Sequence, residues 1–202
     1  MPKVSEEHLT ERQDQILDAA VVCYAQNGFH ATGMADIIRE SGLSAGSVYR
    51  YYKSKDELIA AIITRLLTGL HARLQLSSAA ATTHAELMDA ALTAAQQTFS
   101  GQQLQYARLL PQVWTEALRN PSVAQHVQQS YGVILNHLRE RVAHMQAGGT
   151  LGADLDPAGV AHVTLAAVQG FMLQKLILGD DMGEPSYLSA ARQMFGAGPQ
   201  HQ

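Results

Sequence analysis

The residues with the clearest potential for chemistry lie in one short segment, from Ser44 to Lys55, with the sequence SAGSVYRYYKSK. It combines hydroxyl groups, small residues at the predicted start of a helix, and three cations, Arg50, Lys53 and Lys55. Hydroxyl groups, cationic side chains and backbone amides at a helix N-terminus are groups that contact the phosphates of nucleic acids. The segment therefore predicts contact with a nucleic-acid backbone.

The charge of the chain limits the kind of contact to expect. The chain has 202 residues and a formal net charge of -4, and residues 1–58 carry 6 Lys and Arg against 9 Asp and Glu. A protein that coats DNA without an effector and without sequence preference is expected to have a strongly basic surface. The acidic balance argues against that alternative, so a nucleic-acid contact must rest on the local placement of the cations.

The composition predicts a globular, all-α protein. Hydrophobic residues make up 47% of the chain, Ala, Leu and Gln recur, and runs of β-branched residues are scarce. The single cysteine, Cys23, excludes a disulfide framework and favours a reducing compartment. No stretch approaches the roughly 20 apolar residues of a membrane span, and the first residues lack the apolar core of a secretory signal. We therefore expect a cytoplasmic protein without a membrane partner.

Capping signals predict three helices in the N-terminal part. In chain order these cover residues 10–27, 32–41 and 45–51. A capping box at residues 10–13 marks the first start, and Thr32 and Ser44 are the expected N-caps of the second and third helices. Gly42 supplies the tight turn between the second and the third. Three helices joined in this way match a helix-turn-helix, whose third helix lies in the major groove of DNA.

The rest of the chain carries the same kind of signals and brings the total to about nine helices. The further helices are expected at about 55–76, 85–99, 103–119, 122–146, 157–178 and 185–195. From Val160 to Leu178 apolar residues occur on nearly all sides of the helix. Such a helix must be covered on more than one side, by its own domain and by a second subunit.

Residues 12–62 resemble the DNA-binding domain of the tetracycline-repressor (TetR) family. The resemblance rests on Arg12, Ile16-Leu17-Asp18-Ala19-Ala20, Tyr24, Gly28-Phe29, Thr32, the run from Ile37 to Tyr52, and Lys53-Ser54-Lys55-Asp56-Glu57-Leu58. The departures are Tyr52 in place of the usual Phe, Ile38 where Ala is common, and Ala45 where Lys or a larger polar residue is frequent.

The resemblance implies both a fold and a function. The fold is a helix-turn-helix DNA-binding domain over residues 1–55, followed by a helical-bundle domain over 56–202 for effector binding and dimerisation. The function is a ligand-responsive transcriptional regulator, by family default a repressor, that binds palindromic double-stranded operator DNA as a homodimer and is released by a small effector. It implies neither an enzyme nor a cofactor.

The candidate DNA contacts follow from the resemblance together with the chemistry of the segment. They are Thr32, Ser44, Ala45, Gly46, Ser47, Tyr49, Arg50, Tyr51, Lys53 and Lys55. By resemblance, Tyr49, Tyr51 and Lys55 contact phosphates, with Thr32 and Ser47 helping and Lys53 near the backbone. Ala45 can read at most a thymine methyl, so Arg50 is the leading candidate for a base-specific contact. The alternative is that the tyrosines pack in the core and the lysines are solvated; for Tyr52 we expect core packing.

By resemblance, the effector pocket lies between the helices at 56–76, 85–99, 103–119 and 122–146, and the last two helices pair across a dimer axis. The apolar stripes place these residues in its wall: Leu66, Leu70, Met88, Phe99, Leu110, Trp114, Tyr131, Leu135 and Met172. Such a wall favours a bulky or flat hydrophobic effector. For each residue the alternative is simple core packing; Trp114 and Tyr131 are better candidates because each ring carries a polar atom that needs a partner. An effector there is expected to shift the helix at 56–76 and with it the recognition helices.

Two other kinds of site were weighed. Nine histidines raise the question of a metal, but His126, His137, His144 and His162 show no spacing typical of ligands, so no metal is expected. An enzyme using Arg108, Glu116, Tyr131 or His137 would lack a paired catalytic spacing and would leave the segment from Ser44 to Lys55 unexplained. The sequence leaves open the effector, the operator, the regulated genes, repression against activation, and a dimer against a pair of dimers on DNA.

Overall fold

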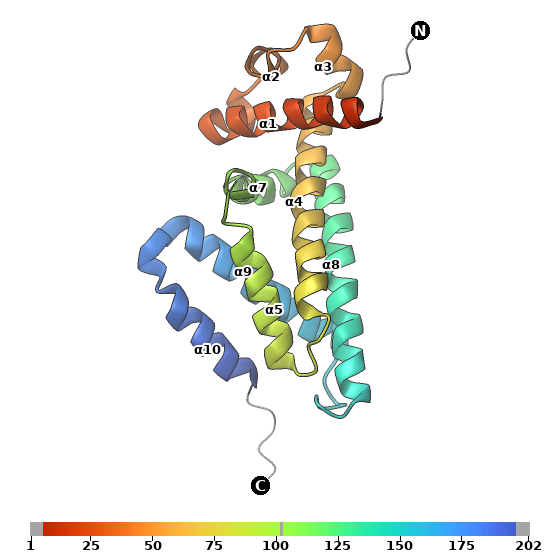
Figure 1. Cartoon of the computed structure of the whole chain (residues 1–202), viewed down its shortest axis with the longest axis vertical. Coiled ribbons are helices and arrows are strands. Elements are labelled where there is room, and N and C mark those ends of the chain that lie inside the picture. The colour runs from red at the N-terminus through yellow and green to blue at the C-terminus, as the bar shows by residue number, and fades with distance from the viewer. Residues whose placement is uncertain (1–5, 102, 197–202) are drawn as a thin grey trace. The chain divides into compact units, whose positions relative to one another are not determined.

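The computed structural model describes residues 6–101 and 103–196, and within them every regular element is a helix (Figure 1). The prediction of an all-α fold is confirmed. The helices are α1 (Glu6–Ala31), α2 (Met34–Ser41), α3 (Ala45–Tyr51), α4 (Lys55–Ser78), α5 (His84–Gln97), α6 (Gln103–Ala107), α7 (Leu110–Ala117), α8 (Pro121–Ala147), α9 (Pro157–Leu178), the 3₁₀-helix η1 (Gly179–Met182) and α10 (Glu184–Gly196).

Packing divides the chain into two compact units. The first contains residues 1–66 and 102–128, and the second contains 67–101 and 129–202. Helices α4 and α8 contribute residues to both units. The packing units therefore do not coincide with a boundary after residue 55, because α6, α7 and the first turns of α8 belong with the N-terminal helices. The division of functions at residue 55 stays a prediction.

Helix α1 is longer than expected at its start and interrupted where expected near its end. It begins at Glu6, so the capping box predicted at residues 10–13 lies inside the helix. The prediction was wrong because residues 6–9 contain nothing that opposes a helix. At Gly28 the backbone leaves the helical region, with φ 78° and ψ 167°, a conformation that in practice only glycine adopts. The regular helix thus ends at Asn27-Gly28, as the sequence indicates.

The helix-turn-helix is formed by α2 and α3. Gly42 takes a left-handed conformation with φ 66° between them, and the Ser44 hydroxyl accepts a hydrogen bond from the Ser47 N–H at 3.2 Å. Both predictions are confirmed. The N-cap of α2 is Gly33, not Thr32, and the Gly33 N–H donates to the Asp36 carboxylate at 2.9 Å. The expected cap was wrong because the Thr32 hydroxyl is used elsewhere, as described below.

The single helix expected over residues 103–119 is two helices, α6 and α7. Pro111 explains the break. It has no N–H to donate to the carbonyl of Ala107, and its ring would collide with that carbonyl in a continuous helix. A turn replaces the helix between them, in which the Leu109 N–H donates to the Tyr106 carbonyl at 3.0 Å. Pro111 then lies in the first turn of α7, where a missing N–H costs nothing.

Four other predicted helix starts are confirmed by side-chain caps. Ser54 caps α4 by accepting from the Glu57 N–H at 3.2 Å, and Thr83 and Glu86 form a reciprocal capping box at α5. The side-chain oxygen of Asn120 accepts hydrogen bonds from the N–H groups of residues 122 and 123 at the start of α8. The Asp156 carboxylate does the same for residues 158 and 159 at α9. Short polar residues thus decide where these helices begin.

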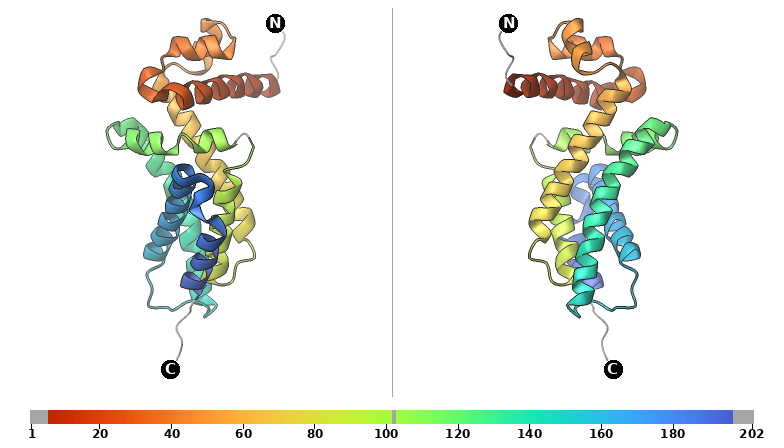
Figure 2. Two further views of the ribbon diagram at one scale, coloured as in Figure 1. Left: turned by 90° about the vertical axis from the view of Figure 1, so that its left-hand side faces the viewer. Right: turned by 90° about the vertical axis from the view of Figure 1, so that its right-hand side faces the viewer.

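The second unit packs α5 against α9 and α10 (Figure 2). One segment, Pro157–Met182, is long and apolar enough to cross a membrane by length and composition, and only 33% of its most apolar window is buried. The expectation that no segment meets this criterion is therefore wrong. A helix that packs on one side against its own domain and on another against a second subunit has the same composition as a membrane span, so composition alone does not separate them.

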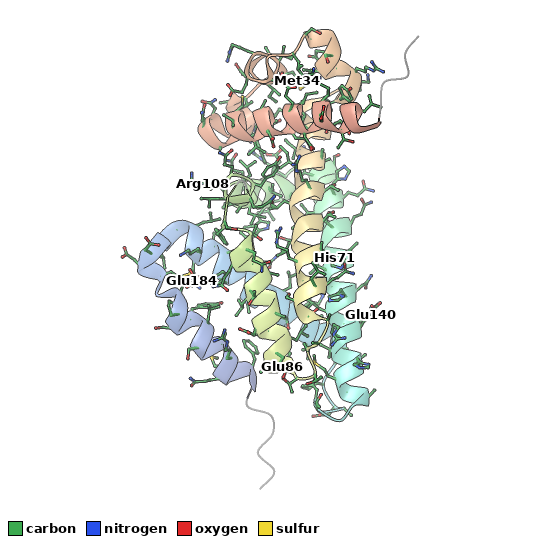
Figure 3. The ribbon with its side chains drawn as sticks, in the orientation of Figure 1. Met34, His71, Glu86, Arg108, Glu140 and Glu184 are labelled. Carbon is green, nitrogen blue, oxygen red and sulfur yellow. The ribbon has the colours of Figure 1, made fainter. Side chains whose placement is uncertain are left out.

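A polar contact joins α4 to α8 in the second unit. The His137 ring bonds to the buried Ser78 hydroxyl at 2.9 Å and lies edge-on to His71, with 5.5 Å between ring centroids. His71 is on α4 and Glu140 on α8 (Figure 3). Arg141 follows Glu140 in the sequence. Burial lowers the pKa of His137, and the neighbouring His71 and Arg141 lower it further against the opposing effect of Glu140. The contact between α4 and α8 therefore favours the neutral imidazole of His137.

The lowered pKa of His137 predicts a loss of stability in mild acid. Below pH about 6.5 the unfolded chain binds a proton at His137 that the folded chain does not, so acidification favours unfolding until the lowered folded pKa is passed. We expect the free energy of unfolding in urea to be smaller at pH 5.5 than at pH 7.5. The difference should shrink in His137→Gln, although His84, whose pKa is also lowered by burial, keeps part of it.

The control is His144→Gln, which removes an exposed histidine two turns further along α8. It should keep the full pH dependence of the wild type. Equal pH dependence in the wild type and His137→Gln would contradict the assignment.

Candidate functional site

Helix α3 is held by one face and presents the other to solvent. Val48 is fully buried and Tyr52 is 8% exposed, so both anchor the helix in the core of the first unit. The expectation that Tyr52 packs in the core is confirmed. On the opposite face Ala45, Gly46, Tyr49 and Arg50 are exposed, with Tyr49 at 42%. A helix of seven residues does not hold its shape alone, so these anchors keep the exposed face in place.

The structure brings most of the predicted DNA contacts together on and beside α3. Ser44 is exposed, and Ser47, Tyr51 and Lys55 are half-buried. Within the residues that the structure describes, Arg50 makes no ion pair. Its guanidinium is therefore free to bind an outside acceptor. The small residues at positions 45 and 46 leave the N-terminal backbone of α3 open to close approach.

Lys53 has a local role that the sequence did not indicate. Its ammonium donates to the carbonyl of Tyr49 at 2.5 Å and of Arg50 at 3.5 Å, which are carbonyls of the last turn of α3. Its own N–H donates to the Glu57 carboxylate at 2.6 Å. A cation at this end of a helix satisfies carbonyls that have no helical donor. Lys53 thus closes α3 and joins it to α4.

Thr32 does not present its side chain to a partner outside the chain. It is 1% exposed, and its hydroxyl lies within hydrogen-bonding distance of the carbonyls of Cys23 at 3.2 Å and Gly28 at 2.9 Å. The contact expected from its position in the sequence is wrong for the side chain, because the hydroxyl is needed inside the turn. Thr32 instead fixes the chain where it passes from α1 to α2.

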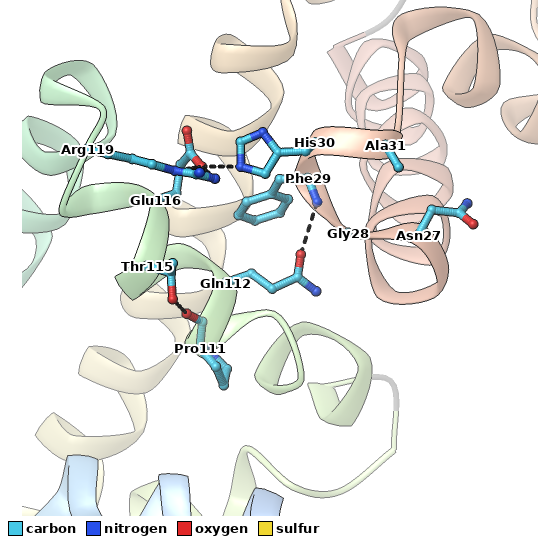
Figure 4. A pocket seen from close by; sticks show the side chains of 10 residues that line it. All are labelled: Asn27, Gly28, Phe29, His30, Ala31, Pro111, Gln112, Thr115, Glu116 and Arg119. Atoms are coloured by element: carbon cyan, nitrogen blue, oxygen red, sulfur yellow. Dashed lines mark hydrogen bonds and ion pairs between the residues drawn. The ribbon is translucent and has the colours of Figure 1, made fainter.

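A second group of polar residues, not predicted, joins α7 to the end of α1 (Figure 4). The break at Gly28 takes the N–H of Phe29 out of the helical hydrogen-bond pattern. The Gln112 side chain bonds to both sides of the break, since its amide nitrogen donates to the Tyr24 carbonyl at 3.2 Å and its oxygen accepts from the Phe29 N–H at 3.1 Å. One side chain of α7 therefore closes the gap in α1.

Beside this clamp, the Glu116 carboxylate contacts the side chains of Arg119, His30 and Asn120. It is 9% exposed, and its carboxylate accepts from Arg119 at 2.7 Å and lies 3.3 Å from the His30 ring. Together with the end of α1, these side chains line a cavity of about 420 Å³ (Figure 4). Its lining residues are Asn27, Gly28, Phe29, His30, Ala31, Pro111, Gln112, Thr115, Glu116 and Arg119.

The nine predicted effector residues are divided between the two units. Leu66, Leu110 and Trp114 belong to the first unit, and Leu70, Met88, Phe99, Tyr131, Leu135 and Met172 belong to the second. Five of them, Leu66, Leu70, Met88, Leu110 and Met172, are buried, while the others are half-buried. None lines the 420 Å³ cavity; Leu135 lines a smaller one of about 220 Å³ with residues of α8 and α9. Their role in effector binding stays a prediction.

Comparison with protein families decides the class of the chain. Residues 16–62 match the model for bacterial regulatory proteins of the tetR family, and residues 86–196 match the C-terminal domain of BetI-type transcriptional repressors. The chain belongs to the TetR family. It is therefore a helix-turn-helix transcriptional regulator, in a family whose members are not enzymes.

Individual TetR-family proteins resemble the chain over most of its length. The transcriptional regulator UidR of Escherichia coli K12 is 26% identical over 183 residues, 90% of each chain. The solved structure of GusR from Salmonella enterica has a TM-score of 0.79 and 27% identity, covering 96% of this chain and 97% of that one. FadR of Bacillus subtilis, solved with stearoyl-CoA, shares the fold with a TM-score of 0.77 at 17% identity, covering 92% and 98%.

Sequence reasoning missed the clamp and the contacts of Glu116 with Arg119 and His30. Two signals pointed toward it: Gly28 predicted a break in α1, and a broken helix must find new hydrogen-bond partners. The identity of the partner could not be read, because Gln112 lies 83 residues from Phe29 along the chain. No group of three or more His, Cys, Asp and Glu side chains that could hold a metal occurs among the described residues.

We expect Gln112→Leu to destabilise this TetR-family protein. The substitution keeps the size of the side chain but removes its hydrogen bonds to the Tyr24 carbonyl and the Phe29 N–H, and it leaves that N–H without its partner. Partly buried polar groups left unpaired cost about 1–3 kcal/mol. Urea unfolding at neutral pH measures the loss.

The matched control is Thr115→Val on the same helix, whose exposed hydroxyl only donates to the Pro111 carbonyl of its own turn. It should change stability by no more than about 0.5 kcal/mol. If both variants unfold at the same urea concentration, Gln112 does not have the role assigned to it.

Proposed function

We propose that this TetR-family regulator is a repressor that binds a palindromic operator as a homodimer and leaves it when a small, mainly apolar effector binds. The observation that carries the proposal is the exposed face of α3, where Tyr49 and Arg50 project from a helix anchored by Val48 and Tyr52. Such a face fits the major groove, in which a recognition helix places its side chains on base edges. The effector-binding and dimerisation functions are assigned to residues 56–202.

The proposed DNA contacts are of two kinds: those that position the protein on the DNA and those that recognise its bases. Ser44, Ser47, Tyr49, Tyr51 and Lys55 contact phosphates and set the register, together with the amides at the start of α3. Arg50 reads a base, with guanine as the partner that a guanidinium prefers. Ala45 contacts at most a thymine methyl, and Gly46 allows the backbone to come close. Lys53 contributes its charge near the DNA backbone while capping α3, and Thr32 contributes through the turn it holds.

Dimerisation is proposed through α9 and α10. Both helices expose large apolar side chains: Val163 at 52%, Ile177 at 70%, Leu178 at 47% and Met194 at 75%. A monomer that leaves such side chains in water gains by burying them against a second copy. Two copies also supply the two recognition helices that a palindrome needs, about 34–36 Å apart.

Release is proposed to depend on α4. This helix begins at Lys55 beside the recognition segment and continues to Ser78 in the second unit. An effector that displaces α4 would move the recognition helices out of register with the two half-sites. The effect is reciprocal, since an effector that weakens operator binding is itself bound more weakly in the presence of operator. The stearoyl-CoA held by FadR supports an effector of small-molecule type.

The DNA contacts are tested with an operator selected from random duplex DNA by the wild-type protein. Arg50→Ala should lower operator affinity about 10–100-fold, the equivalent of about 1–3 kcal/mol for one good base contact, and reduce the preference over scrambled DNA. Lys55→Gln should weaken binding to both DNAs alike and reduce the salt dependence. Fluorescence anisotropy at two salt concentrations measures all of these.

Arg108→Ala removes an exposed cation elsewhere in the first unit and is the control; its binding should match the wild type. The proposal fails if the wild type selects no sequence, or if Arg50→Ala keeps the full preference of the wild type.

The dimer interface is tested with Ile177→Glu. A charge in the middle of an apolar interface is left without a partner, so the variant should be a monomer where the wild type is a dimer, and it should lose tight operator binding. Light scattering during gel filtration measures the mass. Leu76→Glu, at an 81% exposed apolar residue at the end of α4, is the control and should stay a dimer. A dimeric Ile177→Glu would exclude this face.

A further inference from the structure

The second unit contains a cation whose charge is not neutralised. Arg73 lies on α4 and is half-buried, and its Nε is fully buried without a hydrogen-bond partner. Its one hydrogen bond among the described residues runs from Nη2 to the Thr98 hydroxyl at 3.0 Å. That hydroxyl is fully buried and itself donates to the Ala94 carbonyl. Among the described residues, the guanidinium therefore has one hydrogen-bond partner, which is a neutral oxygen.

Two other cations of this unit, Lys175 and Arg192, are paired with carboxylates. Lys175, with 23% of its side chain exposed, has two carboxylates, Glu184 at 2.7 Å and Asp180 at 3.8 Å. Arg192 is more exposed and pairs with Asp89 at 2.6 Å. Burial lowers the pKa of Arg73, and no acidic side chain offsets this effect. A guanidinium stays protonated at neutral pH even so, and burying part of it without an anion has a cost.

The surroundings of Arg73 suit a ligand with one charged end. Gly69 has no side chain, and a Cβ there would lie 3.4 Å from Nη1, so the guanidinium lies close against the backbone of α4. The residue after Thr98, Phe99, is half-buried, and its ring lies edge-on to Phe171 at 6.4 Å between centroids. Guanidinium groups bind carboxylates and related anions through two parallel hydrogen bonds. Phe171 is fully buried, so the half-buried Phe99, next in sequence to Thr98, is the ring that can contact the apolar part of the same molecule.

We propose that the effector of this regulator carries an anionic group, a carboxylate, sulfonate or phosphate on a mainly apolar body, and that Arg73 is the residue that pairs with it. This proposal rests on the proposed function, because it specifies the chemistry of the effector. It also explains why the second unit keeps the Arg73 guanidinium without a carboxylate partner: the anionic group of the effector is that partner.

Arg141 is the alternative receptor for an anion. Its Nε is also buried without a partner. However, its guanidinium donates to the carbonyl of Ala81, in the turn after α4, so it has a structural task. It also stands beside His137 and, in sequence, next to Glu140. Among the described residues Arg73 has neither a backbone carbonyl to hold nor a carboxylate partner, and its one hydrogen bond is to the Thr98 hydroxyl.

The test uses three carboxylates, benzoate, phenylacetate and octanoate, each beside its uncharged amide. Thermal unfolding and calorimetric titration are measured for the full-length wild type, Arg73→Gln, Arg73→Lys and Arg141→Gln. At least one carboxylate should raise the melting temperature of the wild type, and its amide should not. Arg73→Gln should bind that carboxylate at least 10-fold more weakly, Arg73→Lys should lie between, and Arg141→Gln should match the wild type.

A second measurement separates a receptor from a structural residue. Without ligand, Arg73→Gln should melt at the same temperature as the wild type or higher, because removing an unpaired buried charge relieves a cost. A lower melting temperature would mean that Arg73 is needed for folding. The proposal is also overturned if no carboxylate binds, if an amide binds as tightly as its acid, or if only Arg141→Gln loses binding.

Failure of this inference and failure of the proposed function give different results. Ligand-free Arg73→Gln should bind the selected operator within about twofold of the wild type, since the residue lies outside the DNA-binding unit. If the wild type selects no operator, the proposed function fails whatever the carboxylates do. If the operator is bound and the carboxylates are not, only the chemistry of the effector is wrong.

Discussion

The geometry of the DNA-binding unit depends on one interruption, the break of α1 at Gly28. The positive φ at this residue turns the chain toward α2 and takes the Phe29 N–H out of the helical hydrogen-bond pattern. Gln112 of α7 accepts from that N–H and donates to the Tyr24 carbonyl, and Thr32 holds the turn from inside through carbonyls of α1. The place where α2 begins, and with it the position of α3, thus depends on a side chain that is remote in the sequence.

Helix α3 shows how a very short helix can serve as a rigid reading element. Ser44 caps its start and Lys53 its end, so both termini have partners without help from neighbouring helices. Val48 and Tyr52 fix its rotation, because both must stay buried for the unit to keep its core. The burial of these two residues therefore also fixes which residues of α3 face solvent. Arg50 is one of them, and among the described residues it makes no ion pair.

The second unit combines an apolar core with features that lack a partner within the described residues. They include the exposed apolar side chains of α9 and α10, the guanidinium of Arg73, and the buried Nε of Arg141. The proposals assign a second copy of the chain to the first of these features and an anionic effector to the second. A sensor must retain such deficits, because a domain with every group satisfied would gain nothing from binding.

The sequence alone determined most of the helices, because their starts are set by local chemistry; the start of α1, the cap of α2 and the break between α6 and α7 were the exceptions. Ser44, Thr83, Asn120 and Asp156 cap the helices that follow them, and the apolar periodicity marks the buried faces. It also identified the recognition segment, since all its residues are consecutive. Only the tertiary structure decided what depends on contacts between distant residues: the clamp of Gln112, the inward-facing hydroxyl of Thr32, and the lack of a carboxylate beside Arg73. A pattern along the chain shows which groups need partners, but only the fold determines which partner, if any, each one finds.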